Sequence, residues 1–253
     1  MKKSLTQNLI FVVAMVVSLF VIWLIASLLV NNTFLLPTPT MVLAELGTLL
    51  GKVSFYSSVF ATLWRAVVAF AISLVVAFVL AVVINLFNVR KPVSVVITLM
   101  RAMPTISIIF LCLVVFHSNT ISIIVASLVA FPVIYEAFDS AINNGQQLNQ
   151  MCDVFEVGKM ARIRYVFLPL LSKPIYQQSR ATLPLCIKIA VAGEALALPM
   201  EGIGRDMFIA KNAYDMAMLF AWTIVALVIC YLLEASVWGI GKIISKVKGG
   251  NEQ

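Results

Sequence analysis

Charged residues are scarce in this chain. Asp, Glu, Lys and Arg make up 11% of its 253 residues, whereas a soluble globular domain carries about 25%. Histidine occurs once, which excludes an HExxH metal site. The chain has no GxxxxGK[ST] segment, and therefore lacks the usual phosphate-binding loop for ATP. With no catalytic constellation visible, we expect a protein that is not an enzyme and that binds no cofactor itself.

Paired cysteines and alternating strands are also missing. The four cysteines occur singly, at positions 112, 152, 186 and 230. Without a CxxC spacing, neither a metal site nor a disulfide framework is indicated. Segments of period-2 alternation are absent as well, which argues against a membrane β-barrel.

Hydrophobic residues, in contrast, make up 62% of the chain. They recur in runs near 20 residues, the length that crosses a hydrocarbon core of about 30 Å. We therefore expect an all-α, polytopic membrane bundle, embedded in the lipid bilayer as a single domain over residues 1–253. The six expected spans are residues 9–30, 59–86, 93–116, 121–137, 174–198 and 216–240. The first run is too long for a typical signal peptide and is read as an uncleaved span.

The distribution of basic residues predicts the orientation. Six spans place both termini on one side of the membrane, and that side holds 12 of the 18 Lys and Arg residues. The opposite loops hold three, Lys52, Arg205 and Lys211, and the remaining three lie within spans. This bias predicts that both termini are cytoplasmic. The net charge of +7 is thus explained by topology, and nucleic-acid binding is not expected.

The longest polar interruption runs from residue 139 to residue 171. Apolar residues follow at i, i+3, i+4 and i+7, which predicts one face of a short helix: Leu148, Met151, Cys152 and Phe155. Gly158 is expected to end this helix. A second short face is predicted from Met160, Ile163 and Phe167, and Leu168-Pro169 is expected to end the unit. Two readings stay open, a docking surface for a partner outside the membrane or a loop that lies against its own bundle.

Three ionisable residues within the expected spans are candidates for a substrate path, namely Arg101, Lys188 and Glu194. Such residues are costly in a membrane and usually face a cavity or a partner. Lys188 would be a cation that lines the path of an anionic solute. Alternatively, it would form a salt bridge to Glu194 or Glu136, or extend its ammonium group to a membrane interface. Arg101 would line the path or anchor its helix at the inner interface. Pro104 and Pro184 are expected to kink their helices.

The interruption resembles the cytoplasmic loop of permease subunits of type I ATP-binding-cassette (ABC) importers. That loop has the pattern EAA, three residues, Gly, nine residues, Ile, one residue, Leu-Pro. Anchored on Leu168-Pro169, the Ile position is Val166 and the Gly position is Glu156. The EAA positions are Gln150, Met151 and Cys152. The spacing is kept, while the glutamate and the glycine of the pattern are replaced, and Gly158 is expected to supply the turn.

Other stretches resemble the nitrate/sulfonate/taurine group within this family. They are LLPTPTMVLAEL, TLWRAVVAFAISLVVAFVLAVVINLF with Arg65, LMRAMPTISIIFLCLVVF with Arg101 and Pro104, and GEALALPMEGIGRDM with Glu194, Gly202 and Gly204. Their order and spacing agree with the group from about Leu35 to Ile244. The resemblance implies the type I importer permease fold with a cytoplasmic coupling helix.

The resemblance also implies partners and a location. We expect a second copy of this chain, a cytoplasmic ABC ATPase dimer that holds ATP and Mg, and an extracellular or periplasmic solute-binding protein. The location would be the bacterial plasma membrane. Contacts with the ATPase are expected from Leu148, Gln150, Met151, Cys152, Phe155, Glu156, Gly158, Leu168 and Pro169.

The function implied is translocation of a small anion, such as a sulfonate, taurine or nitrate, by alternating access. One alternative is an importer permease for a thiamine pyrimidine precursor or another heterocycle. An alternative from another class is a membrane scaffold or signalling protein that transports nothing.

Overall fold

The computed structural model describes residues 2–87 and 89–249 of the domain expected over 1–253, and the other residues lie outside the described part. Within these ranges every regular element is a helix. The elements are α1 (Lys2–Val30), α2 (Pro39–Leu50), α3 (Val53–Leu86), α4 (Arg90–Ala102), α5 (Thr105–Val115), α6 (Ser118–Asn144), α7 (Gln146–Val154), α8 (Lys159–Arg162), the π-helical η1 (Ile163–Phe167), α9 (Leu168–Ala197), α10 (Ile203–Asn212) and α11 (Met216–Gly249). The expected all-α class is confirmed.

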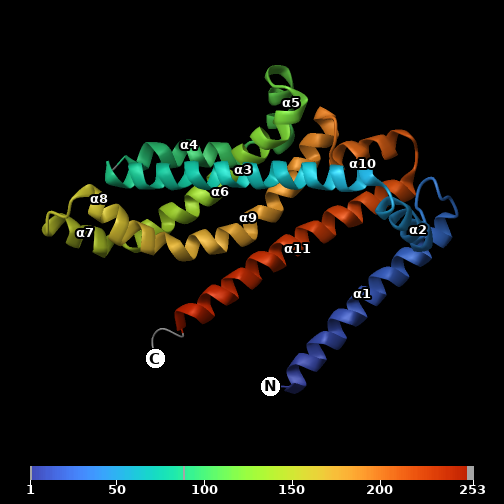
Figure 1. The fold of residues 1–253 in the computed structure, drawn as a ribbon, viewed down its shortest axis with the longest axis horizontal. Coiled ribbons are helices and arrows are strands. Elements are labelled where there is room, and N and C mark those ends of the chain that lie inside the picture. The colour runs from blue at the N-terminus through green and yellow to red at the C-terminus, as the bar shows by residue number, and fades with distance from the viewer. Residues whose placement is uncertain (1, 88, 250–253) are drawn as a thin grey trace.

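Helices α3, α6 and α9 form the core of the bundle (Figure 1). Four alanines on α3 are fully buried, Ala66, Ala69, Ala77 and Ala81. Small side chains let helices approach closely, which drives their association in a membrane. The space between the helices is filled by larger side chains that are also fully buried, among them Ile134 and Phe138 of α6 and Ile187 of α9. The three helices therefore form a tightly packed core, which holds the side chains on them in fixed positions.

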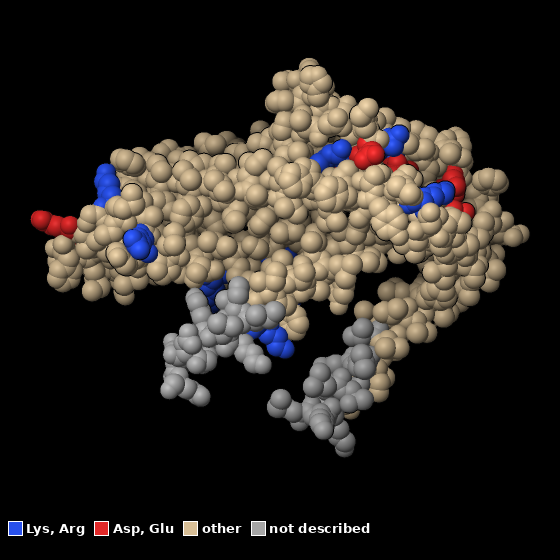
Figure 2. All heavy atoms as spheres, viewed as in Figure 1, with Lys and Arg blue, Asp and Glu red and all other residues tan. Residues whose placement is uncertain are grey.

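The two ends of the bundle carry different elements. Helices α7 and α8 lie at one end, and α2 and α10 lie at the other (Figure 1). Figure 2 shows charged side chains near these two ends and at the lower edge of the visible face, with a largely uncharged surface between them. Helices α1 and α11 both run away from the end that holds α2 and α10 (Figure 1). The uncharged belt is what a bilayer requires, because charged groups in hydrocarbon are costly.

Length and composition identify four described helices that can cross a membrane, namely α1, α3, α6 and α11. The count rises to five if the bent pair α4 and α5 forms one span. A multi-pass membrane bundle is therefore confirmed, while six spans stay a prediction. The expected span 174–198 lies within α9, which packs against α3, α6, α10 and α11. A helix surrounded by other helices needs less apolar surface than one that faces lipid, which explains its lower hydropathy.

The span expected over residues 93–116 is divided into two helices. Helices α4 and α5 meet there at an angle of 92°. Met103 has an extended backbone (φ −68°, ψ 127°) directly before Pro104, as the ring of a following proline favours. The expected kink at Pro104 is confirmed, but α9 continues through Pro184 without a break.

The polar interruption also differs from its prediction. Helix α6 continues to Asn144, beyond the expected start at residue 139. The second short helix is not separate, because α8, η1 and α9 follow one another without a gap. Leu168-Pro169 therefore begins α9 and does not end the unit. In η1 the Leu168 N–H bonds to the Ile163 carbonyl, five residues back, and this wider turn accommodates a proline that has no N–H of its own.

Candidate functional site

Helix α7 projects at one end of the bundle, between α6 and α8 (Figure 1). It ends in a Schellman motif, in which Val157 N–H donates to the Cys152 carbonyl at 2.9 Å and Glu156 N–H donates to the Asp153 carbonyl at 3.3 Å. Glu156 has the left-handed backbone that this motif requires, with φ +51°. The prediction that Gly158 supplies the turn is wrong, because Gly158 has φ −58° and precedes α8.

The predicted apolar face of α7 divides into two parts. Leu148, Met151 and Phe155 are exposed, Phe155 to 72%, whereas Cys152 is buried against the bundle. Three large apolar side chains thus lie on the surface within two turns of one short helix. Contiguous exposed apolar residues of this kind mark interaction sites.

The segment around α7 is held in place by contacts outside its apolar face. Arg162 of α8 forms an ion pair with Asp153 of α7. Lys159 Nζ lies 4.7 Å from the centre of the Phe87 ring, at the end of α3. Both contacts leave the apolar face of α7 uncovered. The remaining expected coupling residues are exposed too: Gln150, Glu156, Gly158, Leu168 and Pro169.

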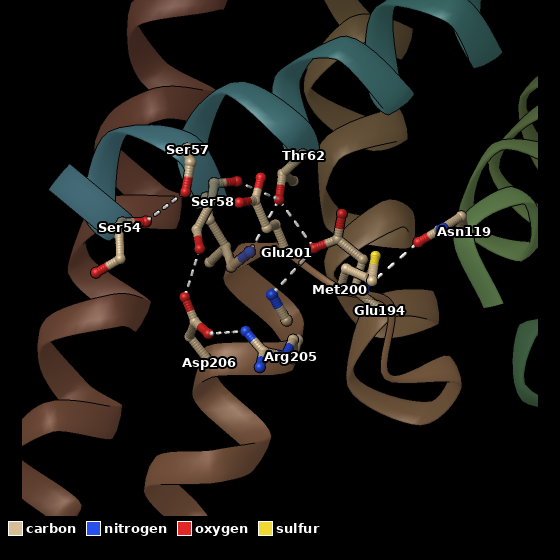
Figure 3. Close-up of polar contacts among 12 residues, drawn as sticks. Ser54, Ser57, Ser58, Thr62, Asn119, Glu194, Met200, Glu201, Arg205 and Asp206 are labelled. Atoms are coloured by element: carbon tan, nitrogen blue, oxygen red, sulfur yellow. Dashed lines mark hydrogen bonds and ion pairs between the residues drawn. The ribbon is translucent and has the colours of Figure 1, made fainter.

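The second site is a buried polar cluster near the opposite end, which joins α3, α9 and α10 (Figure 3). Glu194 is fully buried. Its Oε1 accepts a hydrogen bond from Arg65 Nη1 at 2.7 Å, and its Oε2 accepts one from Thr62 Oγ1 at 2.8 Å. Arg65 Nη1 also donates to the Glu201 carbonyl at 2.7 Å. A carboxylate is stable in such a place only because it is paired with a cation and hydrogen-bonded.

The Gly-x-Gly segment closes this cluster. The N–H of Gly204 donates to Glu194 Oε2 at 3.1 Å. A Cβ on Gly202 would lie 2.6 Å from the Glu194 carboxylate, and a Cβ on Gly204 would lie only 1.9 Å from the Val191 carbonyl oxygen. Gly202 also has φ +154°, where side chains are strained. The two glycines thus bring the start of α10 directly onto α9.

Asp206 extends the polar contacts along α10. Its Oδ2 accepts a hydrogen bond from Ser58 Oγ at 2.6 Å, and its Oδ1 lies 3.3 Å from Arg205 Nη1 (Figure 3). Burial raises the pKa of Asp206 above its ordinary value, while the Ser58 hydrogen bond and the Arg205 charge act in the opposite direction. Ser58, Thr62 and Arg65 follow at i, i+4 and i+7 on α3. This polar stripe in an apolar helix is a signal that the sequence reasoning missed.

The three candidates for the substrate path are not brought together. Glu194 pairs with Arg65, and Arg101 forms an ion pair with Glu136 of α6. The alternative of a salt bridge from Lys188 to either acid is therefore wrong. Lys188 is exposed on α9, and no ion pair involves it within residues 2–87 and 89–249.

Metal binding finds no support in the part of the chain that the structure describes. No three His, Cys, Asp or Glu side chains are grouped there to hold a metal ion. The described residues instead form an exposed apolar face on α7 and a buried ion-pair cluster near α10. They also place several cations along the bundle.

The chain was compared with known proteins at three levels. A search among curated proteins found no match. Among solved structures, the fold is similar to a chain of the MetNI methionine ABC transporter in inward-facing conformations, with a TM-score of 0.64 and 17% identity. The match covers 75% of this chain and 95% of that one. Residues 73–240 match the model of a protein family. The chain therefore belongs to the family of binding-protein-dependent transport system inner membrane components, the permease subunits of ABC importers.

Proposed function

We propose that two copies of this chain form the membrane channel of an ABC importer and that each copy docks one ATPase subunit through α7. The observation that carries the proposal is the exposed apolar face of Leu148, Met151 and Phe155. An amphipathic helix with such a face fits a hydrophobic groove on a partner. Burial of each side chain would contribute about 1.5–3 kcal/mol, which favours a protein partner over continued exposure to water.

The connections of α7 support its role in coupling. It follows α6 after Gly145 alone and precedes the continuous helical run of α8, η1 and α9. Helices α6 and α9 pack against each other in the core. A displacement of α7 by the ATPase would therefore act directly on two core helices. We propose that this movement alternates the channel between outward- and inward-facing states, driven by ATP that the partner binds with Mg.

The solute that we propose is a small anion such as a sulfonate, taurine or nitrate. The exposed cation Lys188 supports this proposal, because a lysine on a helix in the membrane needs a partner or a water-filled path. Arg101 provides a second cation at the α4–α6 contact. A solute-binding protein would deliver the solute from the outside.

Co-purification tests the docking proposal. Phe155→Asp or Leu148→Asp places a charge in the apolar face and should abolish co-purification of an ABC ATPase expressed together with this chain. Tyr214→Asp is a matched control, since Tyr214 is an equally exposed aromatic residue in the turn between α10 and α11, at the other end of the bundle. Retention of the ATPase by both α7 variants, or its loss from the control alone, would show that α7 is not the docking element.

A further inference from the structure

Glu156 occupies a backbone position that disfavours a glutamate. Its φ of +51° lies in the left-handed region, which costs free energy for a residue with a side chain. Its carboxylate also follows the C-terminal end of α7, where the helix dipole favours a cation and disfavours an anion. A glycine would avoid both costs. A residue that opposes two local preferences at once marks a position where function, rather than stability, determines the side chain.

The charge of Glu156 is not compensated within the part of the chain that the structure describes. Glu156 is exposed, and none of the ion pairs found there involves it. The neighbouring cations have other contacts, since Arg162 pairs with Asp153 and Lys159 lies over the Phe87 ring. Acidic side-chain atoms project from this end of the molecule in Figure 2. An acid that its neighbours could have paired is therefore left open to a partner.

This open carboxylate adjoins the apolar face of α7. Glu156 directly follows Phe155, which is 72% exposed and forms the end of that face, while Leu148 and Met151 continue it toward the start of the helix. The surface is therefore an apolar strip with one negative charge at its end. Interfaces combine a hydrophobic centre with a polar rim, and the rim charges select the partner and fix its register.

The position of the acid differs from the loop pattern that this segment resembles. The pattern has its glutamate at the position of Gln150 and a glycine at the position of Glu156. In this chain the first position is a neutral amide within α7, and the acid stands after the end of the helix. The charge thus has a different place relative to the apolar face from the one that the pattern gives it.

We propose that Glu156 forms an ion pair with a lysine or arginine at the rim of the ATPase groove that receives α7, and that this pair selects the matching ATPase. A partner cation would offset both local costs, because it neutralises the acid beside the helix end and is reached from the left-handed turn. The inference rests on the proposed function and adds to it the chemistry of the partner surface.

Glu156→Gln tests the charge, with the full-length permease in lipid nanodiscs and the ATPase that co-purifies with it. The Kd of the ATPase, measured by titration of the labelled subunit, should rise about threefold to tenfold. Glu45→Gln is the matched control, because it removes one negative charge from α2 at the other end of the bundle and should leave the Kd unchanged. An unchanged Kd in Glu156→Gln would overturn the inference.

Glu156→Gly separates binding from stability. It should weaken ATPase binding as much as Glu156→Gln does, although amide exchange at the end of α7 becomes slower. A purely structural role would instead leave binding intact when the helix end is stabilised, and that result would also refute the ion pair.

Salt provides a third measurement. Because ions screen an exposed pair, the affinity of the unmodified permease should fall more steeply with salt than the affinity of Glu156→Gln, and equal slopes would contradict the inference. Failure of the proposed function has a different signature, since the ATPase would then stay bound to Phe155→Asp. If only the inference fails, Phe155→Asp loses the ATPase while Glu156→Gln retains it at full affinity.

Discussion

Arg65 and Glu194 form an ion pair at 2.7 Å between α3 and α9, and the glutamate has no exposed surface. The residues are 129 positions apart. Removal of one partner from a buried pair leaves an uncompensated charge and costs about 3–5 kcal/mol, whereas replacement of both by apolar residues is often neutral. The pair therefore fixes which parts of α3 and α9 meet, and its contribution is measurable by single and double substitution.

Glu194→Leu and Arg65→Met should each lower the thermal stability of the purified protein strongly, by about 3 kcal/mol or more. The double variant should be more stable than either single variant, because neither charge is then left alone. Melting temperatures in detergent would provide the measurement. If the loss of stability in the double variant equalled the sum of the two single losses, the two residues would not be a coupled pair.

Gly204→Ala should destabilise the protein by about 2 kcal/mol or more, because the new Cβ would lie 1.9 Å from the Val191 carbonyl oxygen. Gly47→Ala in α2 is the control. A Cβ at Gly47 has no neighbour within 4 Å, and alanine favours a helix over glycine. Yield and melting temperature should fall for the first variant and hold or rise for the second. A Gly204→Ala protein of normal stability would be inconsistent with the close contact of α10 and α9.

Glu156→Gly should stabilise the end of α7 by about 1 kcal/mol, since glycine avoids the steric cost of the left-handed backbone. Gly158→Ala should have little effect, because Gly158 has an ordinary φ and open space at its Cβ. Amide hydrogen exchange in α7 would report the local change. Faster exchange in Glu156→Gly than in the unmodified protein would contradict the assignment of the turn to Glu156.

Stability should depend on pH through Asp206. Because burial raises its pKa above the ordinary value of 3.8, the folded state binds this proton more readily than the unfolded state. The stabilisation that this bound proton contributes is fully present below the ordinary pKa of Asp206. It is lost as pH rises through the raised pKa of the folded state. The melting temperature of the unmodified protein should therefore fall, relative to that of Asp206→Asn, as the pH rises from acidic to neutral. A difference that is constant with pH would exclude this role.

Lys188→Met should lower solute uptake about tenfold, because a hydrogen bond between charged groups contributes about 1.5–3 kcal/mol. Lys188→Arg should retain most of the activity. Lys211→Met, at the end of α10, is the control for loss of a cation elsewhere. The measurement is uptake of labelled taurine in vesicles, with ATPase co-purification checked in parallel. Unchanged uptake in Lys188→Met would remove Lys188 from the path.

The sequence predicted the membrane bundle and the α7 face for physical reasons. Apolar runs and helical periodicity are local signals, and Leu148, Met151 and Phe155 needed no distant partner to be recognised. The pairing of Arg65 with Glu194 was out of reach, because the sequence does not show which helices meet. The polar spacing of Ser58, Thr62 and Arg65 on α3 would have indicated a buried cluster, but not its partner.

The turn after α7 was mispredicted because the residue type favoured Gly158, whereas the spacing of the loop pattern favoured position 156. Glycine is the usual residue for a left-handed turn, and Gly158 was the nearest one. The hydrogen bonds of the helix end decide the position instead, and they place the left-handed residue at Glu156. The resemblance had identified this same position as a glycine in related permeases, so spacing was a better guide than residue type.

The continuous helical run from Lys159 to Ala197 has a mechanical consequence. Its 39 residues extend over about 58 Å of helix, from the neighbourhood of α7 to the buried polar cluster around Glu194. In the proposed importer, a small tilt imposed near Lys159 would become a shift of several ångströms beside α10. Nucleotide binding on one side of the membrane and gate opening on the other would then be two ends of a single motion.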